Sequence, residues 1–246
     1  MPIVSEYGGL SSLFFKAMAK DFMNSIKTYS AQIIEHIKDA ILQGELGPGD
    51  KVNEAHLAAR LSISRAPIRE ALQMLVQEGL IVSIPQRGKF ITSLTAKEIQ
   101  DSYFAGGVLE GAAVASTIDQ FTENDFNKLQ NIINQMKQLA ENGENRDKLA
   151  PLDNSFHDIL LSKTDNSLLV ELSHRSCRGI SKFLFFKHWR KQFTTKENFE
   201  RHQVLLDVLR TKNPVAVENG IRKHYKEAGE RMKQFGSDVL SMNKVA

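Results

Sequence analysis

Four side chains in the second half of the chain have the types and spacing of a metal site: Asp153, His157, His202 and His224. The first two are four residues apart in a helix predicted over 149–163, so they lie on one helix face. The other two fall on two later predicted helices. One carboxylate and three imidazoles suit zinc, nickel, iron, cobalt or manganese, and ligand type does not choose among them. Because the chain has seven histidines, ordinary core or surface roles are the alternative.

Two arginines one helical turn apart have the placement of a DNA-reading pair. Arg65 and Arg69 stand near the start of a predicted helix whose neighbouring stripe is apolar, so we expect them to face outward. In a helix-turn-helix, the first residues of the second helix reach base edges, where arginine pairs with guanine or grips phosphate. Arg87 and Lys89, in a predicted turn, would meet the DNA backbone or minor groove. Solvated surface charge is the alternative.

The elements around these arginines predict a winged helix-turn-helix. Apolar residues recur at helical spacing from Ser30 to Leu42, a short second helix runs from about Glu54 to Leu61, and a third begins after Ser64 as its N-cap. Gly79 ends the third helix. Residues 80–92 are then predicted to form a strand, a basic turn and a second strand.

Beyond Thr92 the strand pattern gives way to helical periodicity. Capping pairs open two helices, Thr95 with Glu98 and Thr122 with Asp125. The helices are expected over 95–119, 122–141, 149–163, 167–188, 195–210 and 214–236. The fold class is therefore mainly α, with an N-terminal winged helix-turn-helix and a C-terminal antiparallel helical bundle. We divide the chain into an extension over 1–28, a DNA-binding domain over 29–94, an effector and dimerisation domain over 95–236, and a tail over 237–246.

Composition excludes several classes of protein. The 246 residues include one cysteine, Cys177, which cannot form an intrachain disulfide, and no apolar run of the roughly 20 residues that span a bilayer. We therefore expect a cytoplasmic protein without a membrane partner. Residues 1–24 lack the features of a signal peptide. The net charge of +3 is too small to indicate nucleic-acid binding, and residues 29–94 hold seven basic and seven acidic side chains, so the DNA interpretation depends on placement.

A basic, aromatic stretch from Lys182 to Lys196 suggests stacking on single-stranded nucleic acid as one interpretation. Its aromatic residues are Phe185, Phe186, Trp189 and Phe193. We expect instead a helix end and a loop, with the aromatic rings covering a core edge or a dimer contact.

The first of two resemblances lies in the run from Asn53 to Leu72, NEAHLAARLSISRAPIREAL, followed by Glu78-Gly79-Leu80 and Arg87-Gly88. This run closely resembles the winged-helix signature of the GntR superfamily. The resemblance implies that Ser64, Arg65, Ala66, Arg69 and Gly88 contact DNA, and that the chain binds a near-palindromic operator as a homodimer. Ala55 replaces a DNA-contacting arginine of many members, which implies a different operator sequence or affinity.

The second resemblance is to the FCD effector domain of the FadR subfamily. The matching residues are Asp153-x-x-Phe156-His157-x-x-Leu160, Asp165-Asn166-x-x-Leu169, His202, His224 and Pro214. The resemblance implies that the four candidate ligands bind a divalent metal, zinc, nickel or similar, and that an organic acid completes its coordination. Arg175 is the candidate for holding the acid, with a surface role as the alternative. Gly106 stands where many members have arginine, so the effector is expected to be unusual or absent. His36, His56, His174 and His188 fall outside the pattern.

The sequence thus predicts a transcription regulator, not an enzyme, whose operator affinity responds to a small carboxylate at a metal site. Two alternatives stay open. One is a constitutive repressor with a structural metal. The other is a metal-dependent hydrolase joined to a DNA-binding domain, for which the sequence offers no nucleophile motif and no general base beside the ligands.

Overall fold

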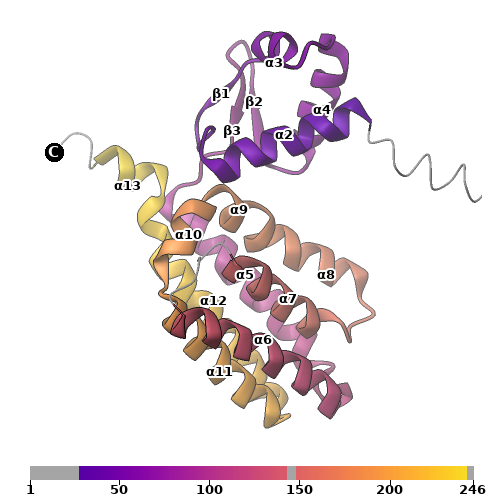
Figure 1. The fold of residues 1–246 in the computed structure, drawn as a ribbon, viewed down its shortest axis with the longest axis vertical. Helices are drawn as coiled ribbons and strands as arrows, with labels where there is room; N and C mark the ends of the chain where they lie inside the picture. The colour runs from indigo at the N-terminus through magenta and orange to yellow at the C-terminus, as the bar shows by residue number, and fades with distance from the viewer. Residues whose placement is uncertain (1–27, 143–147, 243–246) are drawn as a thin grey trace, which may run out of the picture.

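The computed structural model describes residues 28–142 and 148–242, so the predicted extension lies outside the described residues except for Thr28. Two domains follow one another along the chain (Figure 1). The first holds the helices α2 (Tyr29–Gln43), α3 (Glu54–Leu61) and α4 (Arg65–Gln77) and the strands β1 (Lys51–Val52), β2 (Ile81–Ile84) and β3 (Gly88–Ile91). Its antiparallel sheet has the order β1-β3-β2. The predicted winged helix is confirmed, with β1 as an addition whose two residues are too short to show a period.

Apolar stripes fix the three helices of the winged helix against one another. Helix α2 begins at the N-cap Thr28 and ends at Gly44 in the left-handed conformation. Helix α4 buries its stripe completely, with Ile68, Ala71, Leu72 and Leu75 at 0% exposure. Such burial is worth about 1.5–3 kcal/mol for each large side chain, so this face decides how α4 is oriented.

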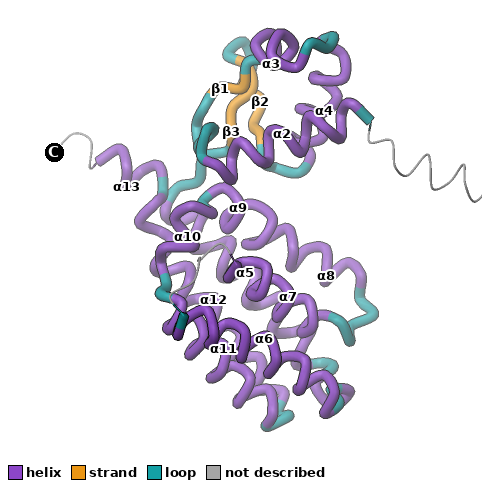
Figure 2. The backbone as a smooth tube through the Cα atoms, viewed as in Figure 1, coloured by secondary structure: helices purple, strands orange, loops and turns teal. Residues whose placement is uncertain are grey.

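The second domain is helical, as Figure 2 shows by colour. Its elements are α5 (Ala96–Ala115), η1 (Ile118–Gln120), α6 (Glu123–Glu141), α7 (Leu149–Leu161), α8 (Ser167–Ser173), η3 (His174–Ser181), α9 (Lys182–Leu184), α10 (Phe186–Gln192), α11 (Thr195–Arg210), α12 (Pro214–Met232), η4 (Lys233–Phe235) and α13 (Ser237–Met242). Helix α5 packs along α12, and α6 packs along α11. The predicted capping boxes at Thr95 and Thr122 are both present, and Asn213 caps α12.

Three glycines of α5 allow a close approach to α12. A Cβ at Gly106 or Gly107 would lie 2.9 Å from side-chain atoms of Tyr225, and one at Gly111 would lie 3.3 Å from the carbonyl oxygen of Glu218. Glycine costs about 1 kcal/mol relative to alanine inside a helix. Here it leaves α12 the space that side chains would need.

The region from 167 to 196 differs from the prediction. The single helix expected over 167–188 is divided into α8, the π-helix η3 and the short α9. The loop expected near the end of this region is helix α10 instead. Phe185, Trp189 and Phe193 are buried in the core, so their apolar burial stabilises helix where charge and aromatic content suggested a loop.

The two domains touch through small residues at the ends of helices. Gly79, just after α4, has a φ of +80°, and a Cβ there would lie 2.9 Å from Cδ1 of Ile180 in η3. Lys187 of α10 lies against Gly44 at the end of α2 in the same way. The tail is also tied to the domain junction, because Ser237 donates a backbone hydrogen bond to the carbonyl of Leu94 at 2.9 Å. Across the described ranges, no helix has the length and apolar character needed to span a bilayer.

Candidate DNA interface and candidate metal site

The start of α4 presents polar side chains to solvent. Ser64, Arg65, Ala66 and Arg69 are all exposed, while the apolar stripe of the same helix is buried. Ser64 occupies the predicted N-cap position, but its side chain makes no capping hydrogen bond. Its hydroxyl therefore stays available to another acceptor or donor at this end of the helix.

Glu54, at the start of α3, holds two of the predicted DNA-contacting side chains. Its carboxylate accepts from Nε of Arg69 at 3.2 Å and from Nζ of Lys89 at 2.7 Å. The Lys89 hydrogen bond is the main cause that lowers the pKa of Glu54, with Arg69 adding to it against the opposing effect of burial. Lys89 has only 19% of its side chain exposed, against 66% for Arg69. Sequence reasoning missed Glu54 because its partners stand on other elements, Arg69 on α4 and Lys89 on β3.

The wing turn places the other two predicted contacts at its tip. Arg87 and Gly88 are exposed between β2 and β3, and Ile84 pairs with Gly88 across the hairpin. Gln86 at φ 61° and Gly88 at φ 107° adopt left-handed conformations. Glycine adopts this conformation without strain, which allows a tight turn. The turn holds the side chain of Arg87 at the end of the hairpin.

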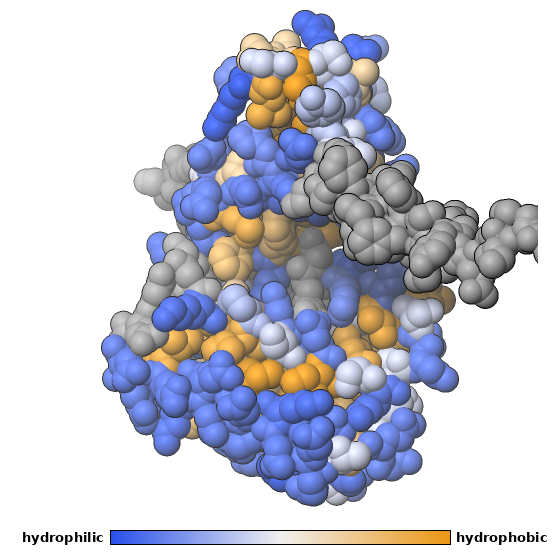
Figure 3. All heavy atoms as spheres, turned by 45° about the vertical axis from the view of Figure 1, so that its right-hand side comes forward, coloured by the Kyte–Doolittle hydropathy of each residue, from blue (hydrophilic) through white to orange (hydrophobic). Residues whose placement is uncertain are grey.

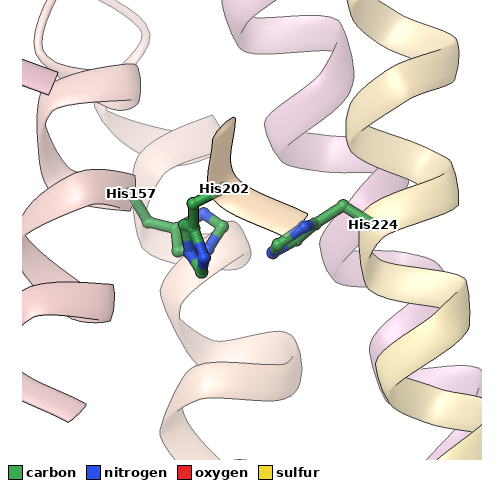
Figure 4. A group of neighbouring side chains, drawn as sticks. All are labelled: His157, His202 and His224. Carbon is green, nitrogen blue, oxygen red and sulfur yellow. The ribbon is translucent and has the colours of Figure 1, made fainter. Parts of the chain in front are cut away.

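The three predicted histidine ligands come together in the helical domain (Figure 4). His157 belongs to α7, His202 to α11 and His224 to α12, and all three are buried. One nitrogen from each ring lies within 4.8 Å of the others. Sequence spacing placed them on three helices, and the packing of those helices makes them neighbours.

Hydrogen bonds set which ring nitrogen of these histidines is free to coordinate. Nδ1 of His157 lies 2.6 Å from Oε1 of Glu110, and Nδ1 of His202 lies 2.7 Å from the carbonyl oxygen of Asn198. Carboxylate and carbonyl oxygens accept, so both Nδ1 atoms donate and Nε2 keeps its lone pair when the ring is neutral. Metal-binding histidines in proteins are held in this way.

One buried nitrogen in the cluster has no donor facing it. Nε2 of His202 makes no hydrogen bond within the described residues and lies 3.3 Å from Oδ1 of Asp153. Either a proton on Nε2 or a bound cation between the two atoms would satisfy both in this buried site. The donor set therefore fits a divalent transition metal.

Burial lowers the pKa of two of the three histidines, His202 and His224. Desolvation lowers the pKa of His202, although Asp153 opposes the shift. Desolvation, with Arg201 and the other two histidines adding to it, holds the pKa of His224 well below its usual range. Both shifts favour the neutral ring, which is the form that binds a metal.

Asp153 joins the cluster through a buried lysine that sequence reasoning missed. Burial alone would raise the pKa of Asp153, but the ammonium of Lys182 and the histidines outweigh it and hold the pKa well below its usual range. Nζ of Lys182 donates to Oδ2 of Asp153 and lies 4.1 Å from the ring centroid of Trp189. Lys182 therefore aims the other oxygen of Asp153 at His202.

Two further members of the site come from α5 and α12. Glu110 is fully buried and also accepts a hydrogen bond at 2.9 Å from the hydroxyl of Tyr225. A charged residue in an otherwise apolar run, Gly106–Ala115, is the signal that could have pointed to it. Arg175 lies elsewhere: its side chain is 59% exposed and pairs with Glu171 at 3.4 Å. It does not line the small cavity at the histidines.

A winged helix with basic residues at its reading end, joined to an all-helical domain with a buried histidine cluster, is the architecture of a two-domain bacterial regulator. The family description "Bacterial regulatory proteins, gntR family" matches residues 29–91, and the FCD domain matches residues 101–227. The chain belongs to the GntR family of DNA-binding transcription regulators and carries the family's FCD domain.

Relatives and solved structures agree with this assignment. The chain is 27% identical over 205 residues to the regulator YdhC of Bacillus subtilis, covering 83% of this chain and 91% of the relative. It is 27% identical to the Nta operon transcriptional regulator of Aminobacter aminovorans, covering 80% and 92%. Escherichia coli McbR/YncC has the same fold, with a TM-score of 0.63 at 19% identity over 85% and 99% of the two chains. Such relatives are named as regulators, and this chain is a regulator rather than an enzyme.

Proposed function

We propose that this regulator binds a near-palindromic operator through the start of α4 and changes its operator affinity when a metal-linked small carboxylate binds in the helical domain. The observation that supports the DNA half is the exposed set Ser64, Arg65, Ala66 and Arg69 at one helix end. Arg87 and Gly88 extend this surface at the wing, and Lys89 supports the wing through Glu54. Such a protein acts where bacterial DNA lies, in the cytoplasm.

The metal would be held by Asp153, His157, His202 and His224. A bound divalent ion supplies a Lewis-acidic centre to which a carboxylate can attach. The chain's own part is to hold each ligand: Glu110 and Asn198 orient two of the rings. A purely structural metal in a constitutive repressor is the alternative, and it differs by giving no response to acids.

The contact between Ile180 and Gly79 gives the route from the ligand site to the DNA. Lys182, which holds the candidate ligand Asp153, is two residues beyond Ile180 in the chain. Ile180 in turn packs on the turn that ends the recognition helix α4. Any shift of the segment around Lys182 would therefore press on, or release, the end of α4, which is a change between two packing arrangements.

An operator with two half-sites requires a second copy of this chain. We expect that copy to pack against the surface formed by α5 and α8. Helices α5 and α8 lie against each other, and three large apolar side chains are exposed on them: Phe104, Leu168 and Leu172. Figure 3, which brings the α8 side forward, shows apolar side chains on this face between hydrophilic surfaces. We propose a homodimer through this face, to be tested by sedimentation of a Phe104→Glu variant, which should be monomeric.

The DNA half is tested with a duplex that the protein selects from a random pool. Replacing both Arg65 and Arg69 by alanine should weaken binding by about 1–3 kcal/mol for each arginine that pairs with a base, and should flatten the dependence of log K on log salt by about 0.9 for each one that pairs with a phosphate. Arg60→Ala, on the same domain and 51% exposed, is the control. Wild-type affinity in the double variant would overturn the proposed interface.

A further inference from the structure

A small cavity lies at the histidine cluster, and one arginine of its lining also lines a larger hollow on the surface. The cavity measures about 30 Å³, and Asp153, His157, Lys182 and His224 are among the side chains that line it. On the outer side, a larger hollow of about 630 Å³ opens between α11 and α12. Arg201 lines both the cavity and the hollow, here called the vestibule, so its side chain lies between them.

The guanidinium of Arg201 is held in place from three sides. It lies 4.0 Å from the ring centroid of Phe193, and its NH2 group donates to the backbone carbonyl of His224 at 2.6 Å. Its carboxylate partner is Glu227, which accepts from Nε at 3.3 Å. The side chain of Arg201 is 15% exposed and that of Glu227 is 44% exposed. Glu227 therefore lies on the solvent side of the pair, where another carboxylate can replace it.

A bound metal would change the charge at this cavity. Asp153, Glu110 and Lys182 are all buried near it, and Lys182 pairs with Asp153. Arg201 and Glu227 balance each other. A divalent cation held there would add positive charge to a buried site, and an anion beside it would lower the cost of that charge.

We propose that Arg201 is the residue that binds the effector's carboxylate, and that a small monocarboxylate enters from the vestibule by replacing Glu227 as the partner of the guanidinium. This inference rests on the proposed function, and it assigns to Arg201 the role that the sequence suggested for Arg175. The cavity holds an ion and about one water, so an acid fits only if Arg201 moves outward. That movement breaks the hydrogen bond from Arg201 to the backbone carbonyl of His224.

The chain offers a matched control for Arg201. Arg231 lies 4.2 Å from the same Phe193 ring and pairs with Glu197 at 3.0 Å. It lines the vestibule and does not line the cavity. The two arginines therefore share charge, aromatic contact and surroundings, and differ in access to the histidine cluster.

The experiment titrates sodium acetate into the full chain loaded with Ni²⁺, by calorimetry at constant ionic strength. Arg201→Met should weaken acetate binding by about 10- to 100-fold, the worth of a hydrogen bond to a charged group. Arg231→Met should bind as the wild type does. Glu227→Gln removes the competing carboxylate and should tighten acetate binding by about two- to fivefold, which keeps the test open if Arg201→Met fails to fold.

Measuring Ni²⁺ binding distinguishes a failure of the proposed metal site from a failure of the role assigned to Arg201. If Ni²⁺ binding does not depend on His157 and His202, the proposed metal site fails whatever acetate does. If Ni²⁺ binds through those histidines but the wild type takes up no acetate, or Arg201→Met and Glu227→Gln bind it like the wild type, the assignment of Arg201 is overturned and the metal site stands.

Discussion

Glu54 restrains the DNA-binding surface, so its neutralisation should strengthen DNA binding. The carboxylate pairs with both Arg69 and Lys89 and carries a negative charge where phosphates would come close. Glu54→Gln keeps an oxygen that can accept from Nε of Arg69 and removes the charge. One added net positive charge at the interface steepens the slope of log K against log salt by up to about 0.9. That slope corresponds to about an eightfold gain in affinity at 0.1 M salt and about threefold at 0.3 M.

Fluorescence anisotropy with the selected duplex, at both salt concentrations, measures this gain. Glu78→Gln is the matched control, because Glu78 also pairs with a lysine, Lys38 at 2.7 Å, but stands at the opposite end of α4. The control should leave the salt slope unchanged. An unchanged or weaker affinity for Glu54→Gln would show that the carboxylate positions Arg69 for DNA, and the reasoning from charge would be refuted.

Two further predictions concern stability. In urea titrations, Gly79→Ala should lower the free energy of unfolding by about 1–3 kcal/mol more than Gly49→Ala does. Both glycines have positive φ, but only a Cβ at Gly79 would meet Ile180. Equal losses in the two variants would contradict the contact between the domains. Metal-free protein should lose stability as the pH falls below about 6.5, the unfolded value, because the folded pKa values of His202 and His224 are lowered, and unfolding then takes up protons. Each ring contributes up to about 1.4 kcal/mol of unfolding free energy per pH unit. In His224→Gln the free energy of unfolding should therefore change less steeply with pH. The same pH dependence in the variant and the wild type would contradict a lowered pKa at His224.

The sequence predicted most elements because their causes are local. Amphipathic stripes, capping boxes at Thr95 and Thr122, and Pro214 after Asn213 each act within a few residues. The division into α8, η3, α9 and α10 was not predictable in this way. There the backbone follows the burial of Phe185 and Trp189 in a core built by distant helices.

The candidate site divides along the same line. The three histidines and Asp153 were identified by their types and spacing, and the structure brings the three rings together. Their supporting groups come from other helices: Glu110 from α5, Lys182 from α9. No periodicity within one helix reveals such pairings, because tertiary packing alone decides which buried charge meets which ligand. The effector-binding role of Arg175 stays a prediction from the sequence. Arg201 lines the cavity at the histidines and Arg175 does not.

The coupling between the metal site and the operator is tested most directly by one linkage measurement. The dissociation constant of Ni²⁺ is measured for the wild-type chain alone and for the chain saturated with its selected duplex, in buffer containing acetate. Because linkage is reciprocal, a site that changes DNA affinity must itself be changed by DNA. The proposed function predicts that the two constants differ by at least about fivefold. Equal constants would contradict it and leave a structural metal in a constitutive regulator.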